Sequence, residues 1–253
     1  PPVQTSETEW FEDRFQEGAK IEAVGGPATF VTKETGFVQS GDQALKRTAK
    51  ETAQDVVNGL SFDIPPNGKF SAWCYIDPDN PPKAVMLQFH VTNWNHRAVW
   101  GTEGIIPYGK VRTPEHVVIG PLPKAGEWVK LEVDAARVDL KPGMKVTGYA
   151  FTQFGGTVYW DQLSISSRVD PKSDPQWSWK VWVEKNQGKR VEGLPNDLQS
   201  LVRGKKAPEW TEAETKRVQD WWFENDYQGA RSIIEGARGE KLAIESKKKA
   251  LED

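Results

Sequence analysis

The sequence contains very little cysteine and histidine: one cysteine, Cys74, and three histidines among 253 residues. A single cysteine cannot form an internal disulfide, and three scattered histidines do not give the ligand spacing of a zinc site. A C-x-x-C-H haem attachment site is excluded outright. Cysteine usage therefore leaves the cellular compartment open.

Long hydrophobic runs and an excess of one charge are also lacking. No stretch approaches the roughly 18 apolar residues that a membrane helix needs, and the mean hydropathy is -0.64. The 33 basic and 36 acidic side chains leave a net charge of -3, whereas domains that bind nucleic acid carry a basic surface. The composition predicts no membrane span and no nucleic-acid partner.

Aromatic residues and short alternating segments are abundant instead, with 12 Trp, 10 Phe and 5 Tyr. Alternation rich in β-formers covers residues 29–32, 69–76, 84–91 and 128–133, and Gly, Pro, Asn and Asp separate these segments. Many short strands without a helical period between them predict an antiparallel β-sandwich or jelly roll over residues 1–168.

The pattern changes after this region. Residues 169–193 form a linker rich in Pro, Asp and Trp, whose tryptophans we expect to dock on the sandwich. Residues 194–253 are expected to be a helical segment. Within it, Leu194-Pro195 opens a short helix that closes at Gly204, and Thr211-Glu212-Ala213-Glu214 is a capping box that starts another. A last helix is expected from Gln228 to the end.

Three motifs resemble those of galactose-binding-like jelly rolls, a fold that many carbohydrate-binding modules share. They are the opening strand Trp10-Phe11-Glu12-Asp13, the turn over residues 39–45 and the closing strand over residues 158–163. The resemblance implies that first and last strands lie together, with a structural Ca²⁺ between their carboxylates. Its ligands would be Glu12, Asp13 and Asp161, completed by backbone carbonyls of the turn. The alternative is that these acids are ordinary surface residues at strand ends.

A longer resemblance covers residues 75–101, 120–133 and 148–152. These segments look like a module of large exported proteins of planctomycete bacteria, which also contain cytochrome-c-like domains. In that family the sandwich precedes a helical linker that begins Leu-Pro, as Leu194-Pro195 does here. The resemblance implies an extracellular, periplasmic or cell-surface location, with other domains of the same polypeptide as partners. A start at Pro1 without Met is what a piece of such a polypeptide would show.

Residues 93–100 bring two indoles, an imidazole, a guanidinium and amides together. Aromatic faces stack on the C–H surfaces of sugars, and Arg, His, Asn and Gln supply the directional hydrogen bonds. In an extended strand every second residue shares one face. The candidate platform for a polysaccharide or oligosaccharide is therefore an even-numbered set, with two further residues from its rim: Gln88, His90, Trp94, His96 and Trp100, then Arg97 and Tyr108.

Other interpretations of these residues stay open. A tryptophan in a sandwich this rich in indoles can belong to the core, and Arg97 can form a structural ion pair with Glu103. Gln88-Phe89-His90 resembles the Q-I-H strand of jelly-roll alginate lyases, with Tyr108 and Arg97 as helpers. The E-x-D-x-E strand of retaining glucanases is absent.

Three functions follow from these patterns. The first is a non-catalytic carbohydrate-binding module, stabilised by calcium, that tethers a larger exported protein to polysaccharide. The second is a polysaccharide lyase built on a jelly roll, and the third is a structural spacer that binds no ligand. We adopt the first as the expectation, which predicts a protein that is not an enzyme.

Overall fold

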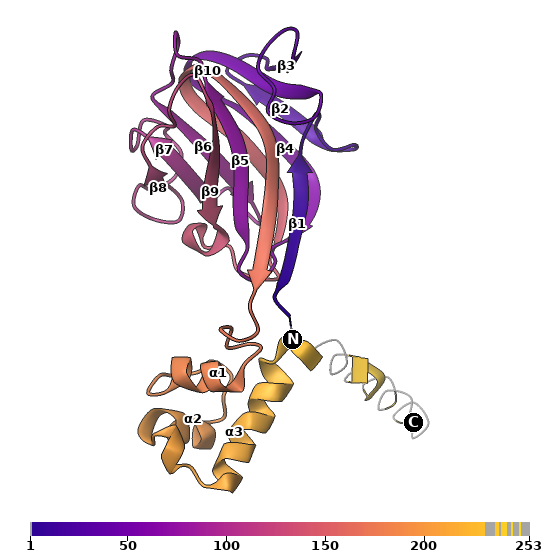
Figure 1. The fold of residues 1–253 in the computed structure, drawn as a ribbon, viewed down its shortest axis with the longest axis vertical. Coiled ribbons are helices and arrows are strands. Elements are labelled where there is room, and N and C mark those ends of the chain that lie inside the picture. Colours follow the sequence, from indigo (N-terminus) through magenta and orange to yellow (C-terminus); the bar gives the residue numbers. More distant parts are fainter. Residues whose placement is uncertain (1, 231–235, 238, 242–243, 245–247, 249–253) are drawn as a thin grey trace. The chain divides into compact units, whose positions relative to one another are not determined.

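The computed structural model describes residues 2–230, 236–237, 239–241, 244 and 248. The chain forms two compact units. One is Thr5–Arg168, and the other is Val169–Asp253 together with Pro1–Gln4. Figure 1 shows strands in the first unit and helices in the second. The predicted fold class, mainly β with C-terminal helices, is confirmed. Among the described residues, every helix is too short or too polar to cross a membrane.

Ten strands of the described chain make up the β unit, hydrogen-bonded as one mixed sheet. β7 and β8 pair in parallel, whereas β4 pairs antiparallel with β2, β3 and β10, and β10 also pairs antiparallel with β5 and β6. The strands predicted at 29–32, 69–76, 84–91 and 128–133 are β3, β5, β6 and β9. In chain order the elements are β1 (Gln4–Phe11), β2 (Lys20–Val24), β3 (Thr29–Thr32), β4 (Gln43–Asp63), β5 (Lys69–Ile76), β6 (Ala84–His90), β7 (His96–Gly101), β8 (Val117–Gly120), β9 (Trp128–Asp134), the 3-10 helix η1 (Ala135–Val138) and β10 (Lys145–Val169).

Two long strands, β4 and β10, run through both layers of the sandwich. The first part of β10, up to Phe154, lies between β4 and β6. After Gly156, β10 pairs with β4 as far as Trp160 and with β5 from Val158 to Ser166. The register shifts between Phe154 and Gly156, where Gly155 and Gly156 have φ of 66° and 74°. A side chain at Gly156 would collide with the backbone of Pro82. This bulge lets one strand change partners and pass from one layer to the other.

The core lies between the two layers. Phe70 of β5 stacks on Phe89 of β6 with 4.0 Å between ring centroids, although these strands do not pair with each other. Trp10 of β1 packs edge-on against both rings and is fully buried. The alternate residues Leu87 and Phe89 face this core. The intervening residues of β6, which include Gln88, therefore face away from it.

The helical unit has its own apolar core. Its elements are α1 (Trp179–Asn186), α2 (Asn196–Gly204), η2 (Ala207–Glu209), α3 (Glu212–Asn225) and η3 (Gln228–Ala230). The predicted capping box is present: Thr211 Oγ1 accepts from the Glu214 amide, and Glu214 Oε2 accepts from the Thr211 amide. The helix predicted after Leu194-Pro195 is α2. The helix predicted from Gln228 to the end falls, beyond Ala230, largely outside the described residues.

The tryptophans of the linker pack within this helical core. Trp182 is 1% exposed among Val218, Trp222 and other apolar residues. Its indole nitrogen donates to Asp226 Oδ2 at 2.6 Å, and Trp179 stacks on it. Trp179 and Trp182 pack between α1 and α3, and docking of the linker on the sandwich stays a prediction. Aromatic residues at 179, 182 and 222 bury one another because no single short helix of this unit can cover its own apolar face.

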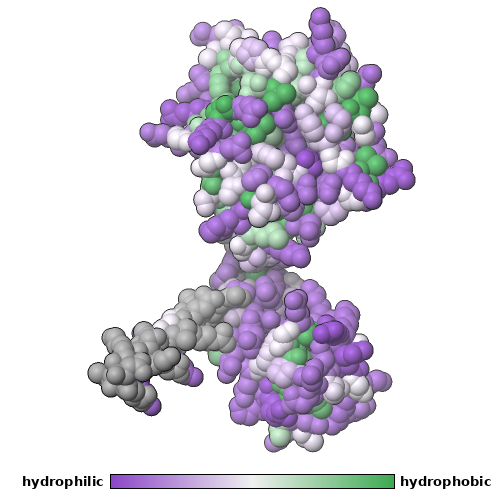
Figure 2. Space-filling model, turned by 180° about the vertical axis from the view of Figure 1, so that it is seen from behind, coloured by the Kyte–Doolittle hydropathy of each residue, from purple (hydrophilic) through white to green (hydrophobic). Residues whose placement is uncertain are grey.

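Hydrophilic residues cover much of the molecular face shown in Figure 2, and hydrophobic residues gather in patches on each unit. The exposed large hydrophobic side chains of the described residues include Ile21, Phe37 and Phe223. Phe37 stacks on Tyr75 with 4.1 Å between centroids and meets Tyr159 edge-on. It therefore belongs to the layer that contains β5, outside the central core.

The bulge at Gly156 gives a first prediction. Gly156→Ala adds a side chain both to a left-handed residue, which costs about 1–2 kcal/mol, and against the Pro82 backbone. Gly143→Ala is the matched control, because Gly143 has φ of 84° and no neighbour within 4 Å of an added Cβ. Chemical denaturation should show a larger loss of unfolding free energy for Gly156→Ala than for Gly143→Ala. Equal losses would mean that the bulge is not closely packed.

Candidate functional site

A row of five side chains crosses the outer face of the layer formed by β2, β4, β10, β6 and β7. Paired positions join Glu22 to Val56, Val56 to Ala150, Ala150 to Gln88 and Gln88 to Arg97. Residues paired across neighbouring strands project to the same face. Strand register alone therefore aligns five residues that are far apart in the sequence.

This row forms the floor of a cavity of about 210 Å³. Gln54 and Asn58 lie two positions on either side of Val56 along β4. Trp94 comes from the bend before β7, and Tyr108 from the loop after it. The full lining is Glu22, Gln54, Val56, Asn58, Gln88, Trp94, Arg97, Tyr108 and Ala150. Amides, a guanidinium and two aromatic rings thus meet in one hollow.

Trp94 forms one wall of the cavity and is half-buried. Its ring lies 5.2 Å from that of His90, whose Nδ1 is hydrogen-bonded to Thr147 Oγ1 at 2.7 Å. The edge of the indole would be 3.4 Å from a Cβ placed on Gly148, and such a Cβ would also press on the Val57 carbonyl at 2.6 Å. Glycine at 148 therefore leaves room for the indole edge above the sheet.

Tyr108 lies in a loop that a buried histidine holds in place. His116 is fully buried; its Nδ1 donates to the Tyr108 carbonyl at 2.8 Å, and its Nε2 accepts from the Gly104 amide at 3.3 Å. With one nitrogen donating and the other accepting, the ring is the neutral tautomer. His116 has a structural role that fixes where the Tyr108 ring enters the cavity.

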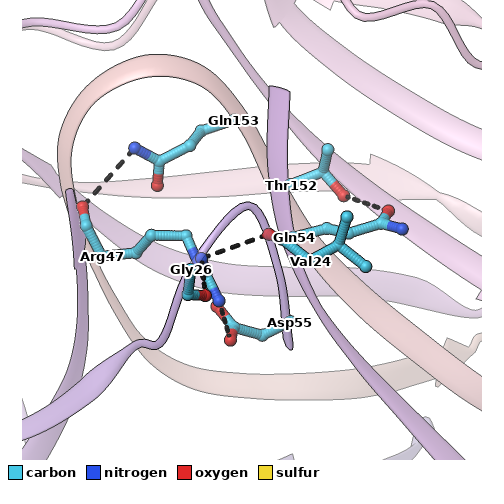
Figure 3. A network of polar contacts seen from close by, with 7 residues as sticks. All are labelled: Val24, Gly26, Arg47, Gln54, Asp55, Thr152 and Gln153. Carbon is cyan, nitrogen blue, oxygen red and sulfur yellow. Dashed lines mark hydrogen bonds and ion pairs between the residues drawn. The ribbon is translucent and has the colours of Figure 1, made fainter. Parts of the chain in front are cut away.

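A chain of hydrogen bonds orders the floor. Arg97 Nε donates to Gln88 Oε1 at 2.7 Å, which leaves Gln88 Nε2 to donate to Gln54 Oε1 at 2.9 Å and Thr152 Oγ1 at 2.7 Å. Figure 3 shows the side chains of Gln54 and Thr152 meeting at this point. The chain fixes which end of each amide is a donor. Gln54 Nε2 has no protein partner among the described residues and so presents a donor to the cavity.

Arg97 is the one cationic residue of the cavity lining. It is 7% exposed, and burial lowers the pKa of its guanidinium, opposed by the negative charge of Glu115 and by Tyr108. Arg97 Nη1 donates to the Glu115 carbonyl at 3.0 Å. The ion pair considered with Glu103 does not form, because Glu103 pairs with Arg112 at 3.2 Å.

Four of the predicted binding residues line the cavity, and two lie elsewhere. Gln88, Trp94, Arg97 and Tyr108 belong to the lining, and His90 packs beside Trp94. His96 and Trp100 do not line the cavity. His96 Nδ1 donates to the Val138 carbonyl at 2.7 Å, and Trp100 is 6% exposed within the central core.

His96 and Trp100 fall outside the cavity because the strand alternation breaks before β7. Residues 91–94 form a bend, and β7 begins only at His96. The alternation starts afresh there, so the even residues of β7 face the core while Arg97 faces the cavity. Sequence reasoning also missed five lining residues: Glu22, Gln54, Val56, Asn58 and Ala150. Gln54, Val56 and Asn58 follow one another at every second position of β4, and this spacing is visible in the sequence. The order of the strands in the sheet, which brings these residues beside Glu22 and Ala150, is not.

A second cluster lies where β1 and β10 meet the loop over residues 39–43. Asp161 Oδ2 accepts from the amides of Gln39 and Ser40 at 2.8 and 3.1 Å. Asp13 Oδ1 accepts from the amides of Asp42 and Gln43 at 2.6 and 2.8 Å. Both carboxylates therefore hold the turn that the sequence motif predicted beside them.

Two carboxylate oxygens in this cluster are left without partners. Asp161 Oδ1 and Glu12 Oε2 are buried and accept no hydrogen bond. Burial raises the pKa of both carboxyl groups, and the negative charge of Asp13 raises it further. A hydrogen bond from the Ser40 side chain opposes this rise at Glu12, and hydrogen bonds from backbone amides oppose it at Asp161. Within the described residues no group of three or more His, Cys, Asp or Glu side chains is placed to hold a metal ion. A cation at Glu12 and Asp161 would therefore need backbone oxygens as further ligands.

The sequence matches no known family model and no curated protein. Its fold is similar to several solved structures. A family 29 carbohydrate-binding module complexed with mannohexaose has 11% identity and a TM-score of 0.38, over 64% of this chain and 92% of that one. TmCBM61 in complex with β-1,4-galactotriose has 9% identity and a TM-score of 0.35, over 59% and 88%.

A glycoside hydrolase domain is also similar. Endo-D from Streptococcus pneumoniae R6 has 11% identity and a TM-score of 0.34, over 58% of this chain and 21% of the hydrolase chain. The present chain thus spans about a fifth of the length of that structure. All three TM-scores lie below 0.5, and none of these similarities assigns the chain to a family.

Proposed function

We propose that the chain is a non-catalytic carbohydrate-binding module whose binding site is the cavity on the outer face of β2, β4, β10, β6 and β7. The observation that carries the proposal is the half-buried Trp94 ring, which lines the cavity together with a floor of ordered amides. An indole packs on the C–H face of a sugar ring, and a few fixed polar groups select its hydroxyls. At about 210 Å³ the cavity is smaller than a typical drug-sized pocket. It suits one ring of a longer glycan that continues along the sheet.

The composition of the lining favours binding over hydrolysis. Glycoside hydrolysis generally requires two carboxyl groups that flank the scissile bond, and the lining contains one, Glu22. The lyase alternative would require a base in the cavity beside Gln88. His90, the histidine of that motif, is not part of the lining, and its Nδ1 is engaged by Thr147.

We further propose that Ca²⁺ binds between Glu12 and Asp161 and stabilises the sandwich. The support is the pair of buried carboxylate oxygens that lack partners, since hard oxygen ligands of this kind suit calcium. The Ca²⁺ would neutralise two negative charges that burial disfavours. Asp13 and Asp161 would keep the turn over residues 39–43 close enough for its carbonyls to complete the site.

The wider role that we propose is attachment. The module would hold a larger exported polypeptide to polysaccharide outside the cell, with its neighbouring domains supplying any chemistry. The resemblance to modules of planctomycete exported proteins supports this setting, and it stays a prediction. The helical unit would then connect the sandwich to those domains.

Removal of the Trp94 indole tests the binding proposal. Loss of a dominant aromatic anchor costs about 2 kcal/mol or more, roughly thirtyfold in affinity. Trp94→Ala should lose that affinity in a glycan array followed by calorimetry, with a nearly unchanged unfolding midpoint. Phe37→Ala is the matched control, because Phe37 is 46% exposed on the layer that contains β5. Equal affinity of the two variants, or unfolding of Trp94→Ala, would place binding elsewhere.

Calcium removal tests the second proposal. The parent protein should unfold at a lower temperature in chelator than with added Ca²⁺, because a ligand at 100 times its Kd adds about 2.7 kcal/mol. Asp161→Asn should give no response to Ca²⁺, and in chelator it should be at least as stable as the parent, since a buried unpaired charge is removed. Asp79→Asn, at an exposed position, should respond as the parent does. A parent midpoint that is independent of Ca²⁺ would contradict the proposal.

A further inference from the structure

Two arginines of the described residues are buried, and they differ in how their charge is balanced. Arg47 is 1% exposed and forms a two-point ion pair with Asp55, Nε to Oδ2 at 2.7 Å and Nη2 to Oδ1 at 2.5 Å. Its Nη1 donates to the carbonyls of Gly26 and Val24. Figure 3 shows the guanidinium enclosed by these groups. Every nitrogen of Arg47 has a partner, and its charge is neutralised.

Arg97 is buried as Arg47 is, but it has no carboxylate counter-ion among the described residues. Its two hydrogen bonds go to neutral acceptors, the Gln88 amide oxygen and the Glu115 carbonyl. No carboxylate oxygen of the described residues lies within 4.0 Å of it, and Nη2 has no partner among them. The Glu115 carboxylate lies near enough to raise the pKa of Arg97, yet it accepts from the Lys110 amide instead.

A buried charge is costly unless an opposite charge or strong hydrogen bonds compensate it. Arg97 also lines the cavity, so a bound molecule can reach the side of the guanidinium that the protein leaves unpaired. Hydrogen bonds between ionised partners are roughly twice as strong as neutral ones, and the planar guanidinium matches carboxylate and sulfate oxygens. The missing counter-ion is therefore one that a ligand can supply.

We propose that the glycan recognised at this site carries an anionic group, and that this group binds Arg97 through Nη2. The inference rests on the proposed carbohydrate-binding function and narrows its ligand class to acidic glycans, either uronates or sulfate esters. Lowering of the Arg97 pKa by burial agrees with a site that lacks its anion.

The lining also sets the direction of the ligand. Glu22 is the one carboxylate of the lining and stands at the opposite end of the row, four strand spacings from Arg97, or about 19 Å. A negative group is attracted at the Arg97 end and repelled at the Glu22 end. The acidic ring therefore lies between Arg97 and Trp94, and neutral or hydroxyl-rich rings extend toward Glu22.

The test compares the binding of each polymer in a charged form and in a neutral form. Polygalacturonate, polymannuronate and polyglucuronate are each offered to the full chain beside their methyl esters, with a sulfated and an unsulfated galactan as a second pair. We expect at least one anionic form to bind about tenfold or more tightly than its neutral counterpart. Preference for the uronates identifies a carboxylate ligand, and preference for the sulfated galactan identifies a sulfate ester.

Variants assign that preference to Arg97. Arg97→Gln should bind the charged and neutral forms alike, and Arg97→Lys should retain part of the difference because it keeps the charge without the planar fork. Arg112→Gln, at an arginine whose side chain is 82% exposed and outside the cavity, should behave as the parent. Loss of the preference in Arg112→Gln, or its survival in Arg97→Gln, would overturn the inference.

The outcomes also distinguish failure of this inference from failure of the proposed carbohydrate-binding function on which it rests. If the parent binds neutral glycans as well as or better than acidic ones, the inference fails and the carbohydrate-binding function stands. If the folded parent binds no member of any pair while Trp94→Ala is equally inert, both fail.

Discussion

The register in which β4 and β10 pair determines the rest of the sandwich. These two strands belong to both layers, and the bulge between Phe154 and Gly156 lets β10 exchange β6 for β5 as its second neighbour. Shifting the pairing by one residue would turn every inward side chain outward. The same register that buries Phe151 and Trp160 in the core brings Ala150 beside Gln88 in the cavity floor. Core and cavity floor are thus two sides of one pairing pattern.

The two proposed ligand sites are both places where the fold leaves charge uncompensated. Among the described residues, Arg97 is buried without an acid, and one carboxylate oxygen each of Glu12 and Asp161 is buried without a hydrogen-bond donor. Arg47 with Asp55 shows that the same sandwich can complete an ion pair internally. Unpaired buried charges cost stability, so a site that is completed only by a ligand couples binding to stability. This is why we propose a cation at one site and an anionic ligand at the other.

Several elements were predictable because their signals are local. Alternation marks β3, β5, β6 and β9, and the capping box at Thr211 and Glu214 marks the start of α3. Gln88 and Trp94 line the cavity as the sequence suggested. His96 and Trp100 lie outside the lining because a bend before β7 resets the alternation. Glu22 and Gln54 were missed because only the spatial order of strands brings β2 and β4 beside β6, and that order depends on long-range pairing.

The central claim is that a glycan binds on the face marked by Trp94 and Arg97. The chain has 12 tryptophans, and the indole N–H signal of Trp94 can be identified by its loss in Trp94→Ala. In an isotope-labelled sample titrated with an oligosaccharide, the account predicts that the signals of the Trp94 indole and the Arg97 Nε–H shift together, while those of the core residues Trp10 and Trp160 stay in place. Shifts confined to tryptophans outside the cavity, with Trp94 and Arg97 unchanged, would contradict it.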